Sequence, residues 1–280
     1  MISLSHLSFG YKKKKLLFED LNLQLSPGHI YGLLGKNGAG KTSLLKNIAG
    51  LSYPKAGTCS INTMTPKRRQ PAFLQQLYYL AEEIYVPDTK AKDFVKGTAP
   101  FYPNFDHEQL NAYLTDFEVP QDSKLTHLSL GQQKKFMIAF ALACNTQVLI
   151  MDEPTNGLDI PSKAKFRKVI ANAFSDDRCI LISTHQVRDL DNLIDSVLIL
   201  HDRRIVLNKS YEDLGKQLYF GLFDQEIGGK SLYAEETYRG TLGIATNDNN
   251  WNSKPDLELL FNAVISDNQS LIHHLNQQPS

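Results

Sequence analysis

The sequence predicts an α/β fold in which a mostly parallel sheet is flanked by helices. Three features support this prediction. Apolar stretches alternate with amphipathic ones from residue 148 to 200, the order typical of parallel strands joined by helices. A glycine-rich loop separates a β-like stretch at 30–34 from a helical stretch at 43–49. A helical block at about 87–144 interrupts the strands, so we expect it to be an insertion between two parts of one sheet.

The elements follow from periodicity and from turn residues. In the first part of the chain we expect an antiparallel β region and further short strands, at Ile2–Leu7, Phe18–Leu25, Thr58–Asn62 and Leu77–Leu80, with a polar, basic loop at 66–70. The block should contain three helices, at Thr89–Lys96, Asp106–Glu118 and Ser129–Cys144. Strands and helices then alternate at Val148–Met151, Ser162–Phe174, Cys179–Ser183, Gln186–Leu193 and Val197–Leu200.

The segment Ser210–Leu218 is expected to close a main domain of residues 1–215, followed by a C-terminal extension at 216–280. Polar residues at 247–255 predict a loop in this extension. Beyond the loop, Leu257, Leu260, Phe261 and Val264 recur at helical spacing and predict an amphipathic helix. We expect its apolar face to dock on the chain itself; a second subunit or a partner is the alternative.

Composition narrows the function. The 30 basic residues balance the 30 acidic ones, so we expect no nucleic-acid partner, and Lys12–Lys15 is most simply a solvated loop rather than a phosphate or lipid contact. Three scattered cysteines suit a reducing compartment and argue against disulfides or zinc. The N-terminus does not read as a signal peptide, and the longest apolar run, 136–144, is too short to cross a bilayer. Any membrane role is therefore expected to come through a partner.

The most specific motif is G-x-x-x-x-G-K-[ST] at residues 35–42, which lies between a predicted strand and a predicted helix. Glycines let backbone N–H groups turn toward phosphate oxygens, and the helix start adds partial positive charge. We expect Lys41 to reach the β/γ-phosphates and Thr42 to ligate Mg²⁺; the alternative is a glycine-rich surface turn. The predicted phosphate-binding residues are Gly35, Lys36, Asn37, Gly38, Ala39, Gly40, Lys41, Thr42 and Ser43.

An apolar strand at 148–151 ends in two carboxylates, Asp152 and Glu153. An acid at the C-terminal edge of a buried strand is well placed to hold Mg²⁺, so Asp152 is a candidate metal ligand. Glu153 should point the other way and be free to orient or deprotonate a water. The alternative is a strand followed by an acidic helix cap.

The segment Leu128-Ser129-Leu130-Gly131-Gln132 opens a helix. Ser129 and Gln132 have the spacing of a capping box. The same helix start, with its hydroxyl and free N–H groups, could also face a phosphate. Spacing alone does not separate these compatible interpretations.

Together, these motifs resemble the ATP-binding subunit of an ATP-binding cassette (ABC) transporter, over roughly residues 2–215. The resemblance implies a P-loop ATPase fold with a helical subdomain at about 87–144, with ATP and Mg²⁺ as cofactors. It implies that two such subunits enclose ATP and drive separate transmembrane subunits from the cytoplasmic face of the membrane.

The resemblance also assigns roles to single residues. Tyr11 stacks on adenine, Ser129, Gly131 and Gln132 contact ATP across the dimer, and Asp159 belongs to the loop that crosses the interface. Glu153 activates water, and His185 is the switch histidine near the γ-phosphate. Each has a plainer alternative: Tyr11 as a loop aromatic, Asp159 as a helix cap and His185 as a structural histidine.

The sequence departs from the family pattern at two positions. Glu82 stands where the family usually has a metal-contacting glutamine; a carboxylate can still ligate Mg²⁺, but it makes nucleotide affinity more dependent on metal. Leu130 replaces a common glycine, and we expect its side chain to point into the helical block, away from phosphate.

The function expected from these features is ATP hydrolysis that powers transport. The acidic, apolar segment Asp256–Phe261 is similar to the ending of exporter-type members, so we expect export. The alternatives are an ABC-type ATPase that acts on nucleic acid or the ribosome, and a regulatory protein that binds nucleotide without hydrolysing it.

Overall fold

The computed structural model describes residues 1–12, 15–223, 231–238, 240–248, 251, 253–266 and 268–277. Two predicted loops are therefore covered only in part: Lys13 and Lys14 of the lysine run, and Asn249, Asn250 and Asn252 of the polar loop in the extension, lie outside the described residues. Within the described residues, no helix is both long and apolar enough to cross a bilayer.

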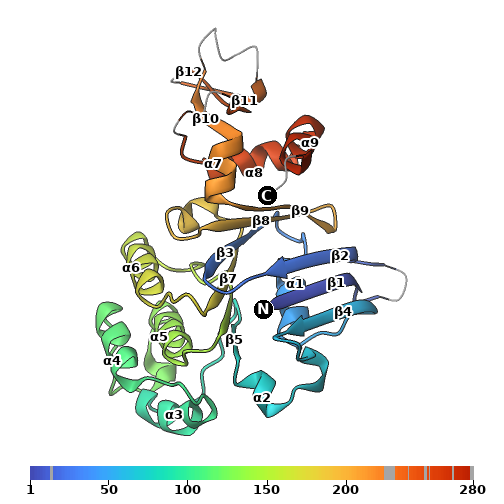
Figure 1. Ribbon diagram of the computed structural model, residues 1–280. Helices are drawn as coiled ribbons and strands as arrows, with labels where there is room; N and C mark the ends of the chain where they lie inside the picture. Colours follow the sequence, from blue (N-terminus) through green and yellow to red (C-terminus); the bar gives the residue numbers. More distant parts are fainter. Residues whose placement is uncertain are drawn as a thin grey trace.

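A six-stranded sheet forms the centre of the molecule (Figure 1). Its strand order is β5 (Leu77–Leu80), β6 (Val148–Asp152), β7 (Cys179–Thr184), β3 (His29–Leu34), β8 (Ser196–His201) and β9 (Arg204–Ser210). All neighbouring pairs are parallel except β8 and β9. Every residue of β6 and β7 is buried, as expected for parallel strands covered on both faces.

This sheet brings together segments that are distant in the sequence. Leu34 at the end of β3 pairs with Thr184 at the end of β7, and Asp152 at the end of β6 pairs with Ser183. The glycine loop, the acidic pair and His185 therefore leave the sheet at the same edge. Ligands of parallel α/β sheets bind at this carboxyl edge.

A separate antiparallel sheet has the order β2 (Phe18–Leu25), β1 (Ile2–Phe9) and β4 (Ala56–Ile61), which confirms the predicted N-terminal β region. Helix α1 (Lys41–Ile48) contacts both β4 and β6. Its residues Leu44, Leu45 and Ile48 are completely buried in one core with the two sheets. The phosphate loop is therefore anchored at its C-terminal end by a fully packed helix.

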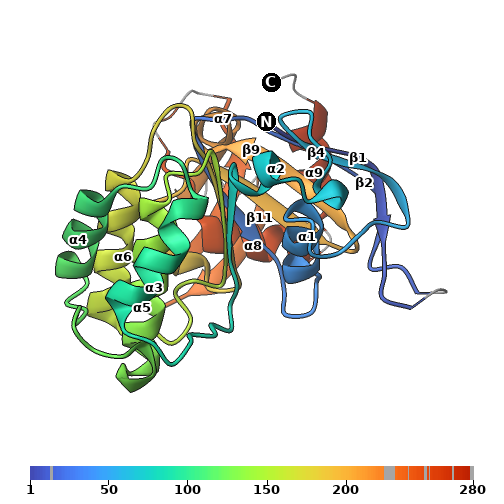
Figure 2. The same cartoon turned by 90° about the horizontal axis from the view of Figure 1, so that it is seen from below.

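The helical block lies on the opposite side of the central sheet from the N-terminal sheet, and the view from below shows the same separation (Figure 2). It comprises α3 (Ala91–Thr98), the 3₁₀ turn η2 (Ala99–Phe101), α4 (His107–Asp116), the turn η3 (Leu125–His127) and α5 (Leu130–Ala143). Helix α6 (Ile160–Asn172) packs beside α4. At the centre of the block, Phe140 is surrounded by aromatic rings.

The C-terminal extension contains more regular structure than the sequence predicts. After α7 (Tyr211–Gln217) comes an antiparallel sheet in the order β10 (Leu218–Leu222), β12 (Gly240–Thr246) and β11 (Ser231–Thr237). Helices α8 (Leu257–Ile265) and α9 (Gln269–Gln277) follow. Helix α8 contacts β8 and buries Leu257, Leu260 and Val264, which confirms that its apolar face docks on the chain itself.

The predicted helix Gln186–Leu193 is wrong: only the short 3₁₀ turn η4 (Val187–Leu190) forms. Asn192 has a positive φ of 61°, which a continuing helix does not allow. Asp195 is bound to β3, because its backbone N–H donates to Ile30 O and its carboxylate accepts from the Ile30 N–H. The chain must therefore turn early to enter β8.

Two other short elements, η1 (Pro66–Arg68) and α2 (Pro71–Leu74), occupy the region predicted as a polar loop and the residues just after it.

All three cysteines are buried free thiols. Burial raises the pKa of Cys59 and of Cys179 to about 12 and also raises that of Cys144. Because the thiolate is the reactive form, we expect no cysteine of the folded protein to react with Ellman's reagent at about pH 8. In denaturant all three should react. A thiol that reacts rapidly in the folded protein would contradict this burial.

Candidate nucleotide-binding site

The glycine loop joins β3 to α1 with the geometry of an anion site. Gly38 and Gly40 have φ values of 80° and 107°, which L-residues with a side chain rarely adopt. A Cβ on Gly40 would lie 2.7 Å from the ring of Phe18. Helix α1 has neither a side-chain cap nor an acidic residue in its first turn. Its first N–H groups are therefore available to an anion.

Lys41 lies within this loop and is only 6% exposed. Its Nζ donates to the backbone oxygen of Gly35 at 2.8 Å and lies 3.4 Å from Oε1 of Glu153. The lysine head group is thus positioned between the loop and the acidic strand, where it can meet a phosphate that enters the loop.

Tyr11 is 70% exposed and lies beside the loop, where its hydroxyl is 3.0 Å from Oγ of Ser43. The ring packs edge-on against Phe9, with centroids 5.0 Å apart. An exposed aromatic ring at this position is suited to stack on a flat base.

Asp152 is almost completely buried, and both carboxylate oxygens have protein partners. Oδ1 accepts a hydrogen bond from Oγ of Ser183 at 2.6 Å, and Oδ2 accepts one from the hydroxyl of Tyr79 at 3.3 Å. Burial, followed by the nearby Asp152 charge, raises the pKa of Tyr79, so this hydroxyl stays protonated and donates. The carboxylate is therefore held in one orientation at the end of β6.

Glu153 has different partners from Asp152, as the alternation along a strand predicts, but it is not free. Its Oε1 faces Lys41, while Oε2 lies 3.0 Å from Nδ1 of His185 and accepts the His185 backbone N–H at 3.3 Å. The prediction that the Glu153 carboxylate is free is therefore wrong, because it contacts both Lys41 and His185. The cause is the parallel pairing of β6 and β7, which brings His185 directly beside the residue that follows β6.

A cavity of about 650 Å³ brings most of the predicted site together. Its lining residues are Tyr11, Leu17, Asn37, Gly38, Gly40, Lys41, Thr42, Ser43, Glu82, Glu153, Asn156 and His185. Several predicted residues do not line it, namely Gly35, Lys36, Ala39, Ser129, Gly131, Gln132, Asp152 and Asp159. The volume lies within the usual range of small-molecule sites.

The Ser129 helix start faces solvent instead of this cavity. The capping box is confirmed: Ser129 Oγ accepts from the Gln132 N–H at 3.2 Å, and Gln132 Oε1 accepts from the Ser129 N–H at 3.0 Å. The prediction for Leu130 is wrong, because its side chain is 83% exposed rather than buried in the helical block. As the first residue of α5, Leu130 points outward while the following turns supply the buried face.

Asp159 is also exposed and caps α6, where its Oδ1 accepts the Ser162 N–H at 2.8 Å. The hydrogen bonds from Ser162 lower the pKa of this carboxyl, so it is ionised and favours the helix start. The helix-cap interpretation is therefore confirmed by the geometry.

Comparison with known proteins agrees with this architecture. The family model described as "ABC transporter" matches residues 18–156, a span that includes the glycine loop, the Ser129 helix start and the acidic strand.

The chain belongs to the ABC transporter family of ATP-binding proteins.

This ABC protein is similar to the ABC transporter ATP-binding protein YtrB of Bacillus subtilis, with 26% identity over 231 residues, 81% of this chain and 78% of YtrB. It is also similar to the ABC transporter ATP-binding protein NatA of the same organism, with 29% identity over 226 residues, 76% of this chain and 91% of NatA. A solved structure of an ATP-binding subunit of an ABC transporter matches with a TM-score of 0.69 and 25% identity, over 76% of this chain and 91% of that one.

Several residues of the site in this ABC protein were missed from sequence, among them Leu17 in the cavity wall. Lys134 of α5 is buried, and its Nζ donates to the backbone oxygens of Glu153 at 3.0 Å and Asn156 at 2.8 Å. Asn156 donates from Nδ2 to Oε1 of Glu82 at 2.9 Å. The Asn-Gly pair at 156–157 signals a turn, but one lysine in a largely buried helix has no pattern that reveals such a role.

Burial lowers the pKa of Lys134, while the nearby Glu82, Glu153 and Asp152 oppose that effect. The ammonium thus links the helix that starts beside Ser129 to the turn that carries Glu153. This link joins the helical block of the ABC protein to the edge of the central sheet.

Proposed function

We propose that this ABC protein is the ATP-hydrolysing subunit of a transporter and acts as a dimer. The main support is that one cavity gathers Tyr11, Lys41, Glu82, Glu153 and His185. The Ser129–Gln132 helix start and Asp159 instead face outward. Two copies arranged head to tail would place the exposed helix start of each over the nucleotide of the other.

In this proposal, the loop 35–43 binds the phosphates of ATP. The N–H groups at the start of α1 and the Lys41 ammonium stabilise the charge that develops on the terminal phosphate. Lys41 already lies between the loop and Glu153, so a phosphate in the loop competes with the Glu153 carboxylate for it. Glu153 is then available to orient the attacking water, and His185 fixes its other oxygen.

The donor set around the cavity fits Mg²⁺, which prefers oxygen ligands and keeps several waters. Thr42 and Glu82 line the cavity and offer a hydroxyl and a carboxylate. Both Asp152 oxygens have protein partners, so contact through water fits that residue best. When bound, the ion would neutralise charge on the phosphates.

We assign the transmembrane partner to a groove between the central sheet and the helical block. The groove has a volume of about 620 Å³, and Leu51, Leu74, Tyr79 and Phe101 are among its lining residues. Leu51 and Phe101 are 49% and 69% exposed and lie in the same groove, and exposed apolar side chains that adjoin one another mark interaction sites. Docking there would place the protein on the cytoplasmic face of a membrane.

We further propose export as the direction of transport, and a division into a cassette at 1–215 and an accessory extension at 216–280. Support for export comes from the acidic, apolar segment 256–261, which forms the start of α8 with Asp256 as its cap. Isolation of the protein from its source with the membrane proteins bound to it tests the direction. Recovery of an importer-type permease together with a substrate-binding protein would overturn the export assignment.

Hydrolysis and dimer formation are tested on the purified chain. Phosphate release from Mg²⁺-ATP should require Lys41, so Lys41→Ala should be inactive and should bind ATP weakly. Light scattering should show a nucleotide-dependent dimer. Binding of ATP without any phosphate release would instead favour a regulatory protein.

Replacement of Glu82 tests the metal dependence that follows from this carboxylate. Glu82→Gln removes one negative charge from the cavity and keeps an oxygen that can accept the hydrogen bond from Asn156. Without Mg²⁺, ATP should bind about fivefold more tightly, which corresponds to about 1 kcal/mol of lost repulsion. With Mg²⁺ the affinity should change little.

Isothermal titration in EDTA and in Mg²⁺ makes this comparison. Glu83→Gln is the matched control, because Glu83 is the exposed neighbour and does not line the cavity. An equal change in both variants would mean that Glu82 has no specific role.

A further inference from the structure

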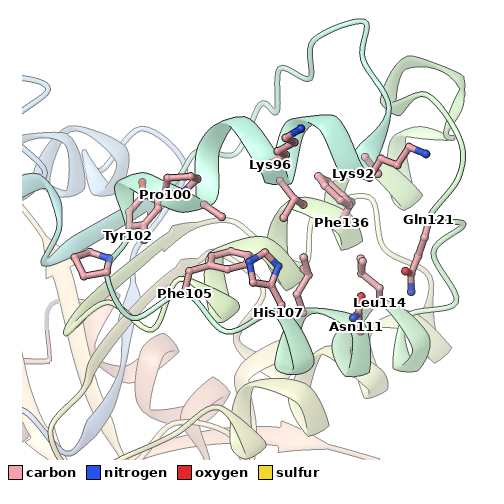
Figure 3. Close-up of a pocket in the computed structure, with 15 residues that line it drawn as sticks. Lys92, Lys96, Pro100, Tyr102, Phe105, His107, Asn111, Leu114, Gln121 and Phe136 are labelled. Carbon is pink, nitrogen blue, oxygen red and sulfur yellow. The ribbon is translucent and has the colours of Figure 1, made fainter.

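A second cavity of about 650 Å³ lies in the helical block, between α3 and α4 (Figure 3). It is distinct from the nucleotide cavity and shares none of its lining residues. Phe136 of α5 contributes to its inner wall and is completely buried. It shares only Tyr102 with the partner groove, so neither ATP binding nor that groove accounts for it, and its volume suits a small molecule.

The inner wall of this cavity is formed mainly by apolar side chains. Ala91, Val95 and Ala99 recur every four residues along α3 and η2 and are buried. Leu110 and Leu114 face them from α4. An apolar chain or ring placed here would be removed from water on several sides, which favours binding in proportion to the area buried.

The rim has positive charge without a counter-charge. Lys92 and Lys96 lie one helical turn apart on α3, and the lining includes His107 but no aspartate or glutamate. Neither lysine takes part in an ion pair or a hydrogen bond among the described residues. A ligand with a negative charge would therefore supply the missing partner.

The lysine rim and the inner aromatic end lie apart along the cavity. Figure 3 shows Lys92 and Gln121 at one end and Phe105 at the other, with His107 beside Phe105. Apolar groups continue toward the lysine end, where Phe136 lies near Lys92. An occupant that fits this arrangement has its charge at the Lys92 end and its apolar body along the inner wall.

We infer that this cavity binds an anionic amphiphile, an apolar chain or ring system that carries one carboxylate. The carboxylate lies at the Lys92 and Lys96 rim, and the apolar body extends over Phe136 toward Phe105. Contact with exposed lysines is weak by itself, so binding requires both the charge and the apolar body. Phe136 belongs to the helix that starts beside Ser129, so the occupant contacts the helix assigned to the dimer interface.

The test uses the full chain with ¹³C-labelled Val and Leu methyl groups, titrated with decanoate below its micelle concentration. The methyl signals of Val95, Leu110 and Leu114 should shift and saturate. Those of Leu51 and Leu74, in the partner groove, should not move. Decanol, which lacks the charge, should bind at least about tenfold more weakly.

Charge reversal provides the second arm. Lys92→Glu combined with Lys96→Glu should weaken decanoate binding at least about tenfold, because both rim charges become repulsive. Lys67→Glu combined with Arg68→Glu, on the exposed turn η1, makes the same change of charge elsewhere and should leave binding unchanged.

The inference is overturned if decanoate shifts none of the methyl signals of Val95, Leu110 and Leu114. It is also overturned if decanol binds the parent protein, and the Lys92→Glu, Lys96→Glu variant binds decanoate, as tightly as the parent protein binds decanoate. Both arms measure binding without ATP. Failure of the amphiphile site is therefore distinguishable from failure of the proposed ATPase function.

Discussion

Glu153→Gln should reduce ATP turnover by at least about 100-fold while ATP still binds, because the amide cannot accept a proton from water or orient it as a carboxylate does. The Glu153 side chain is buried between Lys41 and His185. No other acid among the described residues contacts both of these side chains, so none can take over its role. Glutamine has nearly the same shape and can still accept the His185 backbone N–H. The fold should therefore be kept.

The proposed dimer predicts a second measurable property of Glu153→Gln, its oligomeric state in the presence of ATP. If hydrolysis reopens the two copies, the variant should accumulate as an ATP-bound dimer in size-exclusion chromatography. Phosphate release is measured by a coupled assay, and ATP binding by titration. Glu83→Gln should behave like the parent protein, because that carboxylate is exposed outside the cavity. Retained turnover in Glu153→Gln would remove Glu153 from its assigned role.

The second large effect concerns stability. Phe140→Ala should lower the free energy of unfolding by about 3–5 kcal/mol, the usual cost of removing a buried aromatic ring. Phe140 is completely buried and has ring centroids of Phe94 and Phe105 within 5.1 and 5.2 Å, and that of Tyr78 at 6.0 Å. Tyr78 belongs to β5 of the central sheet, so the cavity would open at the contact between the helical block and the sheet.

Thermal unfolding followed by circular dichroism measures this loss, which should lower the midpoint by roughly 6–15 °C. Phe174→Ala is the matched control, since Phe174 lies just after α6 and is 38% exposed. Its midpoint should change by only a small fraction of that amount. Equal midpoints for the two variants would contradict the assignment of Phe140 to the core of the block.

Local patterns predicted much of the cassette. The strand Leu77–Leu80 has the predicted bounds, and the helices of the block begin and end within two residues of those expected. The capping box of Ser129 and Gln132 was also predicted, because a cap depends only on residues three apart. The extension shows the limit of this approach. Its sheet β10–β12–β11 was missed, because these strands are mostly half-exposed and do not alternate clearly in polarity.

The sequence by itself determined the phosphate-loop motif, the acidic strand end and the helix caps, since each depends on neighbours within a few positions of the chain. Only the tertiary structure decided that Lys41 and His185 both contact Glu153, that Lys134 joins α5 to the following turn, and that Leu130 faces solvent. The Lys41–Glu153 contact depends on strands that lie more than a hundred residues apart in the sequence, and the contacts of His185 and Lys134 join elements that are 32 and 19 residues from Glu153. Periodicity tells which face of an element is apolar, but it does not tell which distant element covers that face.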